Sequence, residues 1–426
     1  MSSPGNAVES ASGTLAVRLF VVMSSGYLMS YGLRAINATI APELVQDLGL
    51  TNTELGSLTS AYFLAFALMQ LPVGIWLDRF GPRRVDAVLM AVAGSGCLVF
   101  ATAQGFAQLW LGRALLGVGF AAGLMACFAM FRLWFPPHQQ TRLAAWTMTV
   151  GTCGVLTATL PVRALLSVTD WRGVFLICAG ILFVLSLLMW FALPRAREPR
   201  GQQGQSLLVL LRGYGGILRD GFFWRMALLG GLVQGGFIAI QTLWLGPWFI
   251  RVLGMTPQSS ASWLFAFNVA LLIGFVVVGV LAPRVGPREA TTVRVAGIAA
   301  LVCTLLTGLT AAWPVFAGVW AWLALAVCNT VFVPIHSRVG MSFPGHLAGR
   351  ALTAYNLVIF VAAFAVQSIL GIVADWLLAG GWTEADAFRA GLGALAITQM
   401  VAWLLFVRWP RPRATGSLAQ PLDPGP

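Results

Sequence analysis

Charged residues are scarce in this sequence, and lysine is absent. Charged residues make up 9% of the 426 residues and hydrophobic residues 58%, whereas an average soluble domain is about 25% charged. A water-soluble core cannot hide that much apolar surface, so we expect lipid to surround most of the chain. The lack of lysine also excludes a phosphate-binding loop of the form G-x-x-x-x-G-K-[ST], and hints at a GC-rich bacterial genome.

Histidine and cysteine offer no catalytic or metal-binding cluster. The three histidines, His138, His336 and His346, are scattered, and no H-E-x-x-H pattern is present. All six cysteines lie inside apolar runs, where thiols behave as small hydrophobes. We therefore expect no disulfide, no metal, no cofactor and no enzyme activity.

Long hydrophobic runs, by contrast, fill most of the chain. Most of them approach or exceed the roughly 20 residues that a helix needs to cross a bilayer. The sequence predicts an all-α polytopic membrane protein with twelve spans, at residues 18–40, 55–77, 87–103, 109–131, 143–165, 174–193, 222–250, 263–281, 295–310, 316–335, 352–378 and 388–407. An even number of spans places both termini on one side.

The net charge of +12 comes from arginine alone. On this span map most arginines fall on the side that holds both termini, and only Arg163, Arg172, Arg251 and Arg389 fall on the other side. Short cytoplasmic loops of membrane proteins are rich in basic residues. We therefore expect cytoplasmic termini in a bacterial plasma (inner) membrane, with the bilayer and no nucleic acid as partner. The first 17 residues do not resemble a cleavable signal peptide.

Two loop patterns occur twice at nearly equal offsets, which indicates a duplicated half. The matching residues are Gly74, Arg79, Gly81, Pro82 and Arg83 with Gly279, Arg284, Gly286, Pro287 and Arg288, and Phe135, Pro136, His138 and Arg142 with Phe343, Pro344, His346 and Arg350. We expect six-helix bundles at 18–194 and 221–409, a cytoplasmic linker at 195–220 with a short surface helix near its end, and tails at 1–17 and 410–426.

The first loop also resembles a known signature. It reads Gly74, Asp78, Arg79, Gly81, Arg83 and Arg84 in the spacing G-x-x-x-D-R-x-G-x-R-R, which resembles the second-to-third helix loop of the major facilitator superfamily (MFS). Arg113, Gly117 and Gly119 resemble that family's R-x-x-x-G-x-G motif. The resemblance implies two six-helix bundles, secondary transport by alternating access, and a monomer.

By the same resemblance, the loop residues form a conformational latch. Gly74 would allow a helix of the other half to approach closely, and Asp78 would accept hydrogen bonds from a facing helix N-terminus. Arg79, Arg83 and Arg84 would complete the charge network, unless they only fix topology. Pro283 stands at the equivalent place in the second half, so we expect the latch to be asymmetric.

Two arginines lie at least one helical turn inside expected spans, where ionisable groups are costly and usually line a pathway. Arg34 lies in the first span, which we expect to end at Pro42, and Arg113 lies in the fourth. No carboxylate occupies the middle of any expected span, so the predicted cavity is positive and suits an anion. For Arg34, substrate contact competes with a structural pair with Glu43 or with helix carbonyls. For Arg113, the structural role is favoured.

Tyr31, Arg34 and Asn37 resemble the first-helix pattern of the organic-anion symporter branch of that family. The acid of that pattern is replaced by Leu33, and Phe120 stands where the branch often has a second carboxylate, which leaves proton coupling open. A further set could line the cavity from the second half or bridge helices: Gln234, Gln241 and Asn356.

The sequence therefore predicts a secondary active or facilitative transporter of a small organic anion. Two alternatives are a multidrug or metabolite exporter and a non-transporting sensor with a transporter fold. Direction of transport and coupling ion do not follow from these patterns.

Overall fold

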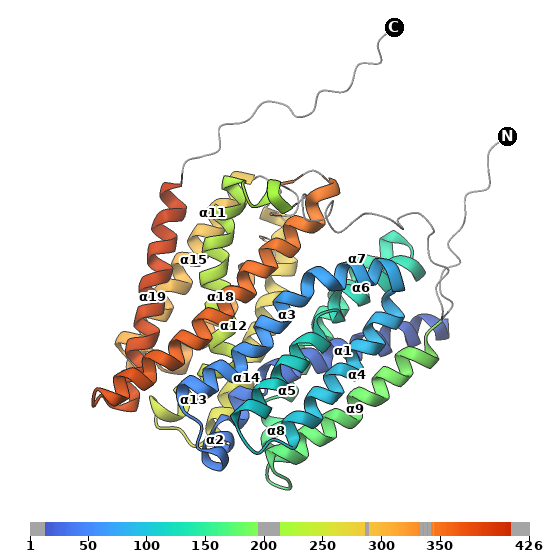
Figure 1. The fold of residues 1–426 in the computed structure, drawn as a ribbon. Helices are drawn as coiled ribbons and strands as arrows, with labels where there is room; N and C mark the ends of the chain where they lie inside the picture. The colour runs from blue at the N-terminus through green and yellow to red at the C-terminus, as the bar shows by residue number, and fades with distance from the viewer. Residues whose placement is uncertain are drawn as a thin grey trace, which may run out of the picture.

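The structure, a computed structural model, describes residues 13–194, 214–285, 289–332, 335, 339, 342–343 and 345–409. Every regular element in this part of the chain is helical. The helices form two groups that lie side by side, one drawn in blue to green and the other in green to red (Figure 1). The all-α prediction is confirmed.

The first group contains the six expected spans, three of which are broken in the middle. Its helices are α1 (Gly13–Ala35), α2 (Asn37–Leu48), α3 (Asn52–Phe80), α4 (Pro82–Ala101), α5 (Phe106–Phe120), α6 (Gly123–Trp134), α7 (Pro137–Thr157), α8 (Leu160–Leu165) and α9 (Trp171–Ala192). The pairs α1 and α2, α5 and α6, and α7 and α8 each form one broken span.

The second group contains the other six spans. They are α11 (Gly221–Gly230) with η1 (Gly231–Gly235), α12 (Gly236–Ala239), η2 (Ile240–Trp244) and α13 (Leu245–Arg251), then α14 (Pro257–Val285), α15 (Glu289–Ala312), α16 (Pro314–Asn329) with η3 (Thr330–Phe332), α18 (Gly345–Ala379) and α19 (Glu384–Arg408). In the part of the chain that the structure describes, eleven helices are long and apolar enough to cross a membrane. The 29-residue α3 makes the twelfth.

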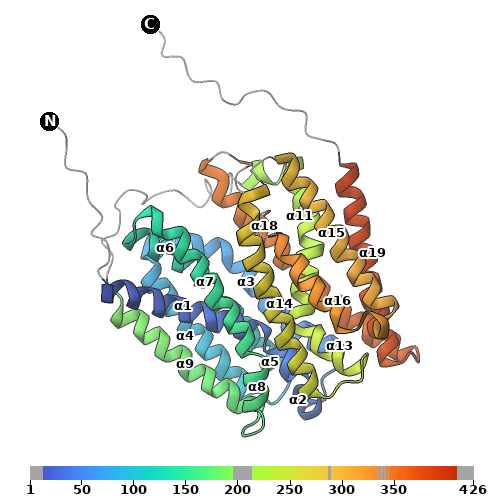
Figure 2. The same ribbon diagram turned by 180° about the vertical axis from the view of Figure 1, so that it is seen from behind.

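The domain boundaries stay a prediction, because most of the linker at 195–220 lies outside the described residues. In the second copies of the loop patterns, residues 286–288 and 344 lie outside the described residues, as do the side chains of 279–285 and 345–350. Helices α3 and α19 both end at the same end of the molecule, which we call the terminal face. The other end, where α2 terminates and α19 begins, is called the opposite face (Figures 1 and 2).

The expected end of the first span at Pro42 is wrong. The chain turns at Ile36, and α2 then continues through Pro42 to Leu48. Proline lacks the N–H that would bond to the carbonyl four residues earlier, which frees the carbonyl of Ala38. That carbonyl faces Gly246 of α13, where an added Cβ would lie 2.0 Å from the oxygen. The proline therefore allows a close contact with the second group of helices.

Glycines bring the helices of the first group into close contact. A Cβ added to Gly154 of α7 would lie 2.1 Å from the carbonyl oxygen of Leu28 in α1, and one added to Gly32 of α1 would lie 2.9 Å from the oxygen of Gly154. Small residues at such positions let helix backbones approach closely in a membrane. The contact between α1 and α7 depends on them, and it fixes the position of the half of α1 that carries Arg34.

We expect Gly154→Ala to destabilise the protein, because a rigid carbonyl occupies the place of the new methyl group. The loss should be about 1–3 kcal/mol, the usual cost of overpacking. Gly180→Ala is the matched control, since nothing lies within 4 Å of a Cβ at Gly180 in α9. The measurement is the thermal unfolding midpoint in detergent, and equal midpoints for the two variants would show that the contact is not tight.

Candidate functional site

Arg34 of α1 is surrounded by aromatic rings from three helices. Its guanidinium carbon lies 4.7 Å from the ring centroid of Tyr31, 5.2 Å from Phe66, 5.4 Å from Phe360 and 5.7 Å from Tyr62. These distances lie within the range of cation–π attraction. Tyr62 and Phe66 belong to α3 and Phe360 belongs to α18, so this enclosure joins the two groups of helices.

Arg34 has no ion pair with any described acidic residue, and its Nε has no hydrogen-bond partner. The pair with Glu43 that the sequence allowed is not formed. Glu43 instead pairs with Arg163 near the opposite face. The charge of Arg34 is therefore held by ring faces and not by a carboxylate.

Arg113 of α5 contacts the ring of Tyr62 as well. Its side chain is fully buried, and its guanidinium carbon lies 5.3 Å from the ring centroid of Tyr62. One terminal nitrogen donates a hydrogen bond of 2.8 Å to the carbonyl of Leu33, next to Arg34 in the chain. Its Nε and other terminal nitrogen have no partner. Arg113 thus has the expected structural contact and unused donors as well.

Tyr62 joins the two arginines into one site. Its ring is buried and contacts both guanidinium groups, and its hydroxyl group has no hydrogen-bond partner in the described chain. Buried polar groups are nearly always hydrogen-bonded, so each exception needs an explanation. The two guanidinium groups and the hydroxyl have unused hydrogen-bond donors, and neither arginine is paired with an acid in the described chain. A bound anion would accept hydrogen bonds from these donors.

The other predicted residues of the first half have different surroundings. Tyr31 packs against Tyr27 with ring centroids 4.7 Å apart, and it forms one wall of the Arg34 enclosure. Asn37 is fully buried and donates a 2.7 Å hydrogen bond to Thr59 of α3. The Asn37 side-chain oxygen has no partner. Asn37 therefore links α2 to α3, and its contacts do not include Arg34.

The seventh span contains two π-helical turns, η1 and η2, which are frequent at functional sites. Gln234 lies in η1 and is buried with its amide nitrogen unpartnered. Gln241 lies in η2 and donates a 2.9 Å hydrogen bond to Asn268 of α14, so it bridges two helices. Asn356 lies in α18 and is partly exposed.

The two groups of helices are joined by hydrogen bonds at the opposite face. The carboxylate of Asp375, in α18, accepts bonds from the backbone N–H groups of Asn52 (3.1 Å) and Thr53 (2.6 Å) and from the Asn52 side chain (2.8 Å). It therefore caps the N-terminus of α3, where the helix dipole favours a negative charge. Arg251 of α13 donates a further 2.6 Å bond to the Asn52 side chain.

Close backbone contacts extend this closure toward the site. A Cβ added to Gly371 would lie 2.4 Å from the carbonyl oxygen of Asn52, and one added to Gly56 would lie 2.7 Å from that of Gln367. One turn farther into α3, the hydroxyls of Ser60 and Ser368 are 2.7 Å apart. Between the opposite face and Arg34, α3 and α18 are therefore in tight contact.

The loop that resembles the family signature lies at the terminal face. Among the described residues, no atom lies within 4 Å of a Cβ built on Gly74. Gly81 ends α3 with φ of 77°, a value that favours glycine. Arg83 donates a 3.0 Å bond to the carbonyl of Leu193 at the end of α9, while Arg79 and Arg84 are exposed. The side chain of Asp78 lies outside the described residues.

Sequence reasoning missed Tyr62, Phe66 and Phe360, which complete the Arg34 enclosure. Tyr62 and Phe66 are four residues apart and so share a helix face, but no pattern marks that face as polar. Asp86, about one turn into α4, is fully buried, and both of its carboxylate oxygens lack a hydrogen-bond partner in the described chain.

Comparisons with known proteins agree with this architecture. The family model described as Major Facilitator Superfamily matches residues 23–367. A probable L-galactonate transporter of Escherichia coli is 31% identical over 185 residues, which are 43% of this chain and 40% of that protein. A probable nitrate/nitrite antiporter of Thermus thermophilus is 27% identical over 290 residues, 65% of this chain and 61% of that protein. Both matches thus span less than two thirds of the relative.

Solved structures share the fold at low sequence identity. A bacterial homologue of the human lysosomal transporter Spinster, in an inward-facing and unoccupied conformation, has a TM-score of 0.75 at 15% identity. The superposition covers 93% of this chain and 97% of that one. At this identity the similarity concerns the fold alone.

We expect Asp375→Asn to weaken the closure at the opposite face, because the α3 N-terminus loses a charged acceptor. Hydrogen bonds to charged groups contribute about 1.5–3 kcal/mol, so the ratio of closed to open molecules should fall about tenfold or more. Spin labels at Gln46 of α2 and Gln258 of α14, in a background without the native cysteines, should then show a longer distance component by double electron–electron resonance.

The matched control is Asp170→Asn, because Asp170 caps α9 within the first group through a 2.8 Å bond to the N–H of Gly173. That variant should leave the distance between the labels unchanged. An unchanged distance in Asp375→Asn as well would show that its carboxylate does not hold the two groups together.

Proposed function

Because the chain belongs to the major facilitator superfamily, we propose that it carries a small organic anion across the membrane by alternating access. Members of this superfamily hold substrate near the midplane, between the two halves. Arg34 meets that description, since the rings around it come from α1 and α3 of one half and α18 of the other. It also lies 14 residues, or about 21 Å of helix, from the end of α2.

The observation that carries the proposal is the pair of guanidinium groups around Tyr62. Both lack an acidic partner in the described chain, and three of their nitrogens have no hydrogen-bond partner at all. An unpaired charge in a membrane protein costs several kcal/mol, and a bound carboxylate would offset that cost. A cationic substrate would meet two positive charges and gain nothing.

The names of two related transporters support an anionic substrate. One is named for galactonate and another for nitrate and nitrite, and all three are anions. The aromatic walls around Arg34 add apolar contact area, which suits an organic anion more than a small inorganic one. Tyr31 and Arg113 belong to the proposed binding site, together with Tyr62 and Phe360. Gln234 is the proposed contact from the second half because its amide nitrogen is free.

The transport cycle would depend on closures at the two ends of α3. In this conformation Asp375 bonds to the α3 N-terminus at the opposite face, while no atom of the described residues approaches a Cβ at Gly74. The proposed latch of Gly74, Asp78 and Gly81 would close the terminal face in the other state, with Arg79 and Arg84 nearby and Arg83 anchored on α9. If the terminal face is cytoplasmic, as the arginine distribution favours, the conformation seen here would face inward.

We expect Arg34→Ala to lower the uptake of labelled organic anions into proteoliposomes by about 10- to 100-fold, the equivalent of one lost charged hydrogen bond. Tyr62→Phe, which removes only the hydroxyl, should lower uptake about 3- to 10-fold. Neutral and cationic solutes serve as comparison substrates, and each anion is tested with and without a pH gradient to detect proton coupling.

Arg18→Ala is the matched control, because Arg18 is an exposed arginine of the same helix. Its uptake should equal that of the wild type. Transport of cationic or lipophilic compounds that is unaffected by Arg34→Ala would refute the anion proposal and favour the exporter, whereas binding without any flux would favour the sensor.

The proposed latch makes a second prediction, opposite in sign to that for Asp375. Loss of the charge in Asp78→Asn should destabilise the state in which the terminal face is closed. Molecules with a closed opposite face should then become more abundant, and the short distance between labels at Gln46 and Gln258 should gain population. A shift toward the longer distance would contradict the role of Asp78.

A further inference from the structure

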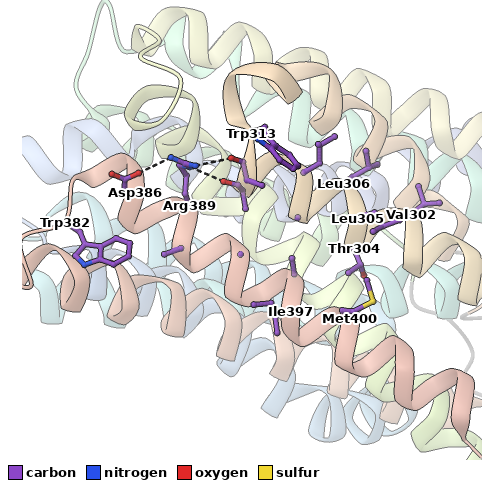
Figure 3. Close-up of a pocket in the computed structure, with 17 residues that line it drawn as sticks. Val302, Thr304, Leu305, Leu306, Trp313, Trp382, Asp386, Arg389, Ile397 and Met400 are labelled. Atoms are coloured by element: carbon purple, nitrogen blue, oxygen red, sulfur yellow. Dashed lines mark hydrogen bonds and ion pairs between the residues drawn. The ribbon is translucent and has the colours of Figure 1, made fainter.

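A long groove lies on the outer surface of the second group of helices, between α15 and α19 (Figure 3). Its volume is about 1000 Å³, and its lining is almost entirely apolar. Three small residues, Gly308, Ala390 and Gly393, leave space between the two helices. This groove is separate from the Arg34 site, which lies between the two halves.

The rim of the groove belongs to the surface that faces the lipid. Leu305 is 56% exposed and Ile397 is 67% exposed, and both belong to membrane-spanning helices. A groove of this shape and chemistry fits the acyl chains of a lipid. No other apolar molecule is present at comparable concentration around a membrane-spanning helix.

One end of the groove is polar. Arg389 donates hydrogen bonds to Asp386 (3.0 Å) and to the carbonyls of Ala311 (3.1 Å) and Ala312 (3.0 Å), as the dashed lines in Figure 3 show. A guanidinium group has five N–H donors, so two remain. The Arg389 and Asp386 side chains are 37% and 47% exposed. A positive and a negative group are thus both accessible at the same end.

Two tryptophans mark this polar end as the level of the lipid headgroups. Trp313 is 65% exposed and Trp382 is 51% exposed, and both line the groove beside Arg389. Exposed tryptophans gather where hydrocarbon meets headgroups. A lipid whose chains fill the groove would therefore place its headgroup against Arg389 and Asp386.

We propose that this groove binds one phospholipid whose headgroup carries both a phosphate and a primary ammonium group. The phosphate would accept the two remaining N–H bonds of Arg389, and the ammonium would donate to the carboxylate of Asp386. The Asp386 side chain already accepts a 2.8 Å bond from Thr383, which holds it in place.

The charges distinguish this headgroup from the other common kinds. An anionic headgroup without an amine brings its phosphate close to the Asp386 carboxylate and gains nothing from that side chain. A quaternary ammonium has no N–H to donate to Asp386. The primary ammonium is the only one of the three that can satisfy both members of the pair.

The test is native mass spectrometry of the full chain, released from membranes and re-equilibrated with equal amounts of phosphatidylethanolamine, phosphatidylglycerol and phosphatidylcholine. The wild type should retain one phosphatidylethanolamine about tenfold more than either other lipid, the equivalent of one charged hydrogen bond. Asp386→Asn should bring the ethanolamine and glycerol lipids to near-equal retention.

Gly393→Leu should remove the retained lipid by filling the groove, since only Ala311 lies near a Cβ at Gly393, at 3.9 Å. Gly180→Leu is the control, because Gly180 is also exposed on a spanning helix with open space around it. Equal retention of the three lipids by the wild type, or unchanged retention in Gly393→Leu, would overturn the proposal. A dimer that Gly393→Leu dissociates would overturn it too, because a second copy would then occupy the groove.

Discussion

The packing of α3 against α18 is the contact on which the rest of this structure depends. These two long helices come from different halves, and α3 runs from the opposite face to the terminal face. Their contact brings Asp375 to the N-terminus of α3, aligns Ser60 with Ser368, and places Phe360 over Arg34. Gly56 and Gly371 allow the two helix backbones to touch. A modest tilt between α3 and α18 would therefore change all three contacts together. The closure and the candidate site are in this way mechanically linked.

The arginines show how acids determine which positive charges are free to bind a ligand. Near the opposite face, Arg163, Arg172, Arg251 and Arg389 each have an acidic partner, at Glu43, Asp47, Glu384 and Asp386. Deep in the molecule, Arg34 and Arg113 have ring faces and one backbone carbonyl instead. Cation–π contacts contribute about 0.5–2 kcal/mol each, which offsets only part of the cost of a buried charge. The site is therefore less stable than it could be, a common property of functional sites.

Much of the fold could be predicted from the sequence, because a span in lipid must be long, apolar and helical. The twelve spans and their order follow from that constraint. The break at Ile36 could not be predicted, because Pro42 looked like the end of a helix. The missing N–H of Pro42 is tolerated because the neighbouring helix α13 packs against the freed carbonyl of Ala38. Contacts between distant segments of this kind leave no local pattern in a single sequence.

The candidate site was only half predictable, for a physical reason. A charge inside a span is conspicuous, so Arg34 and Arg113 could be found from the sequence alone. Tyr62, Phe66 and Phe360 could not, since an aromatic residue in a span is ordinarily packing material or a lipid contact. The same reasoning explains Asp375. At the end of a span it looks like one more surface acid, and only the position of α3 makes it a helix cap between the two halves. An acid with that geometry stabilises the conformation in which the two halves touch, and α3, which Asp375 caps at one end, carries the loop of the proposed Asp78 latch at its other end.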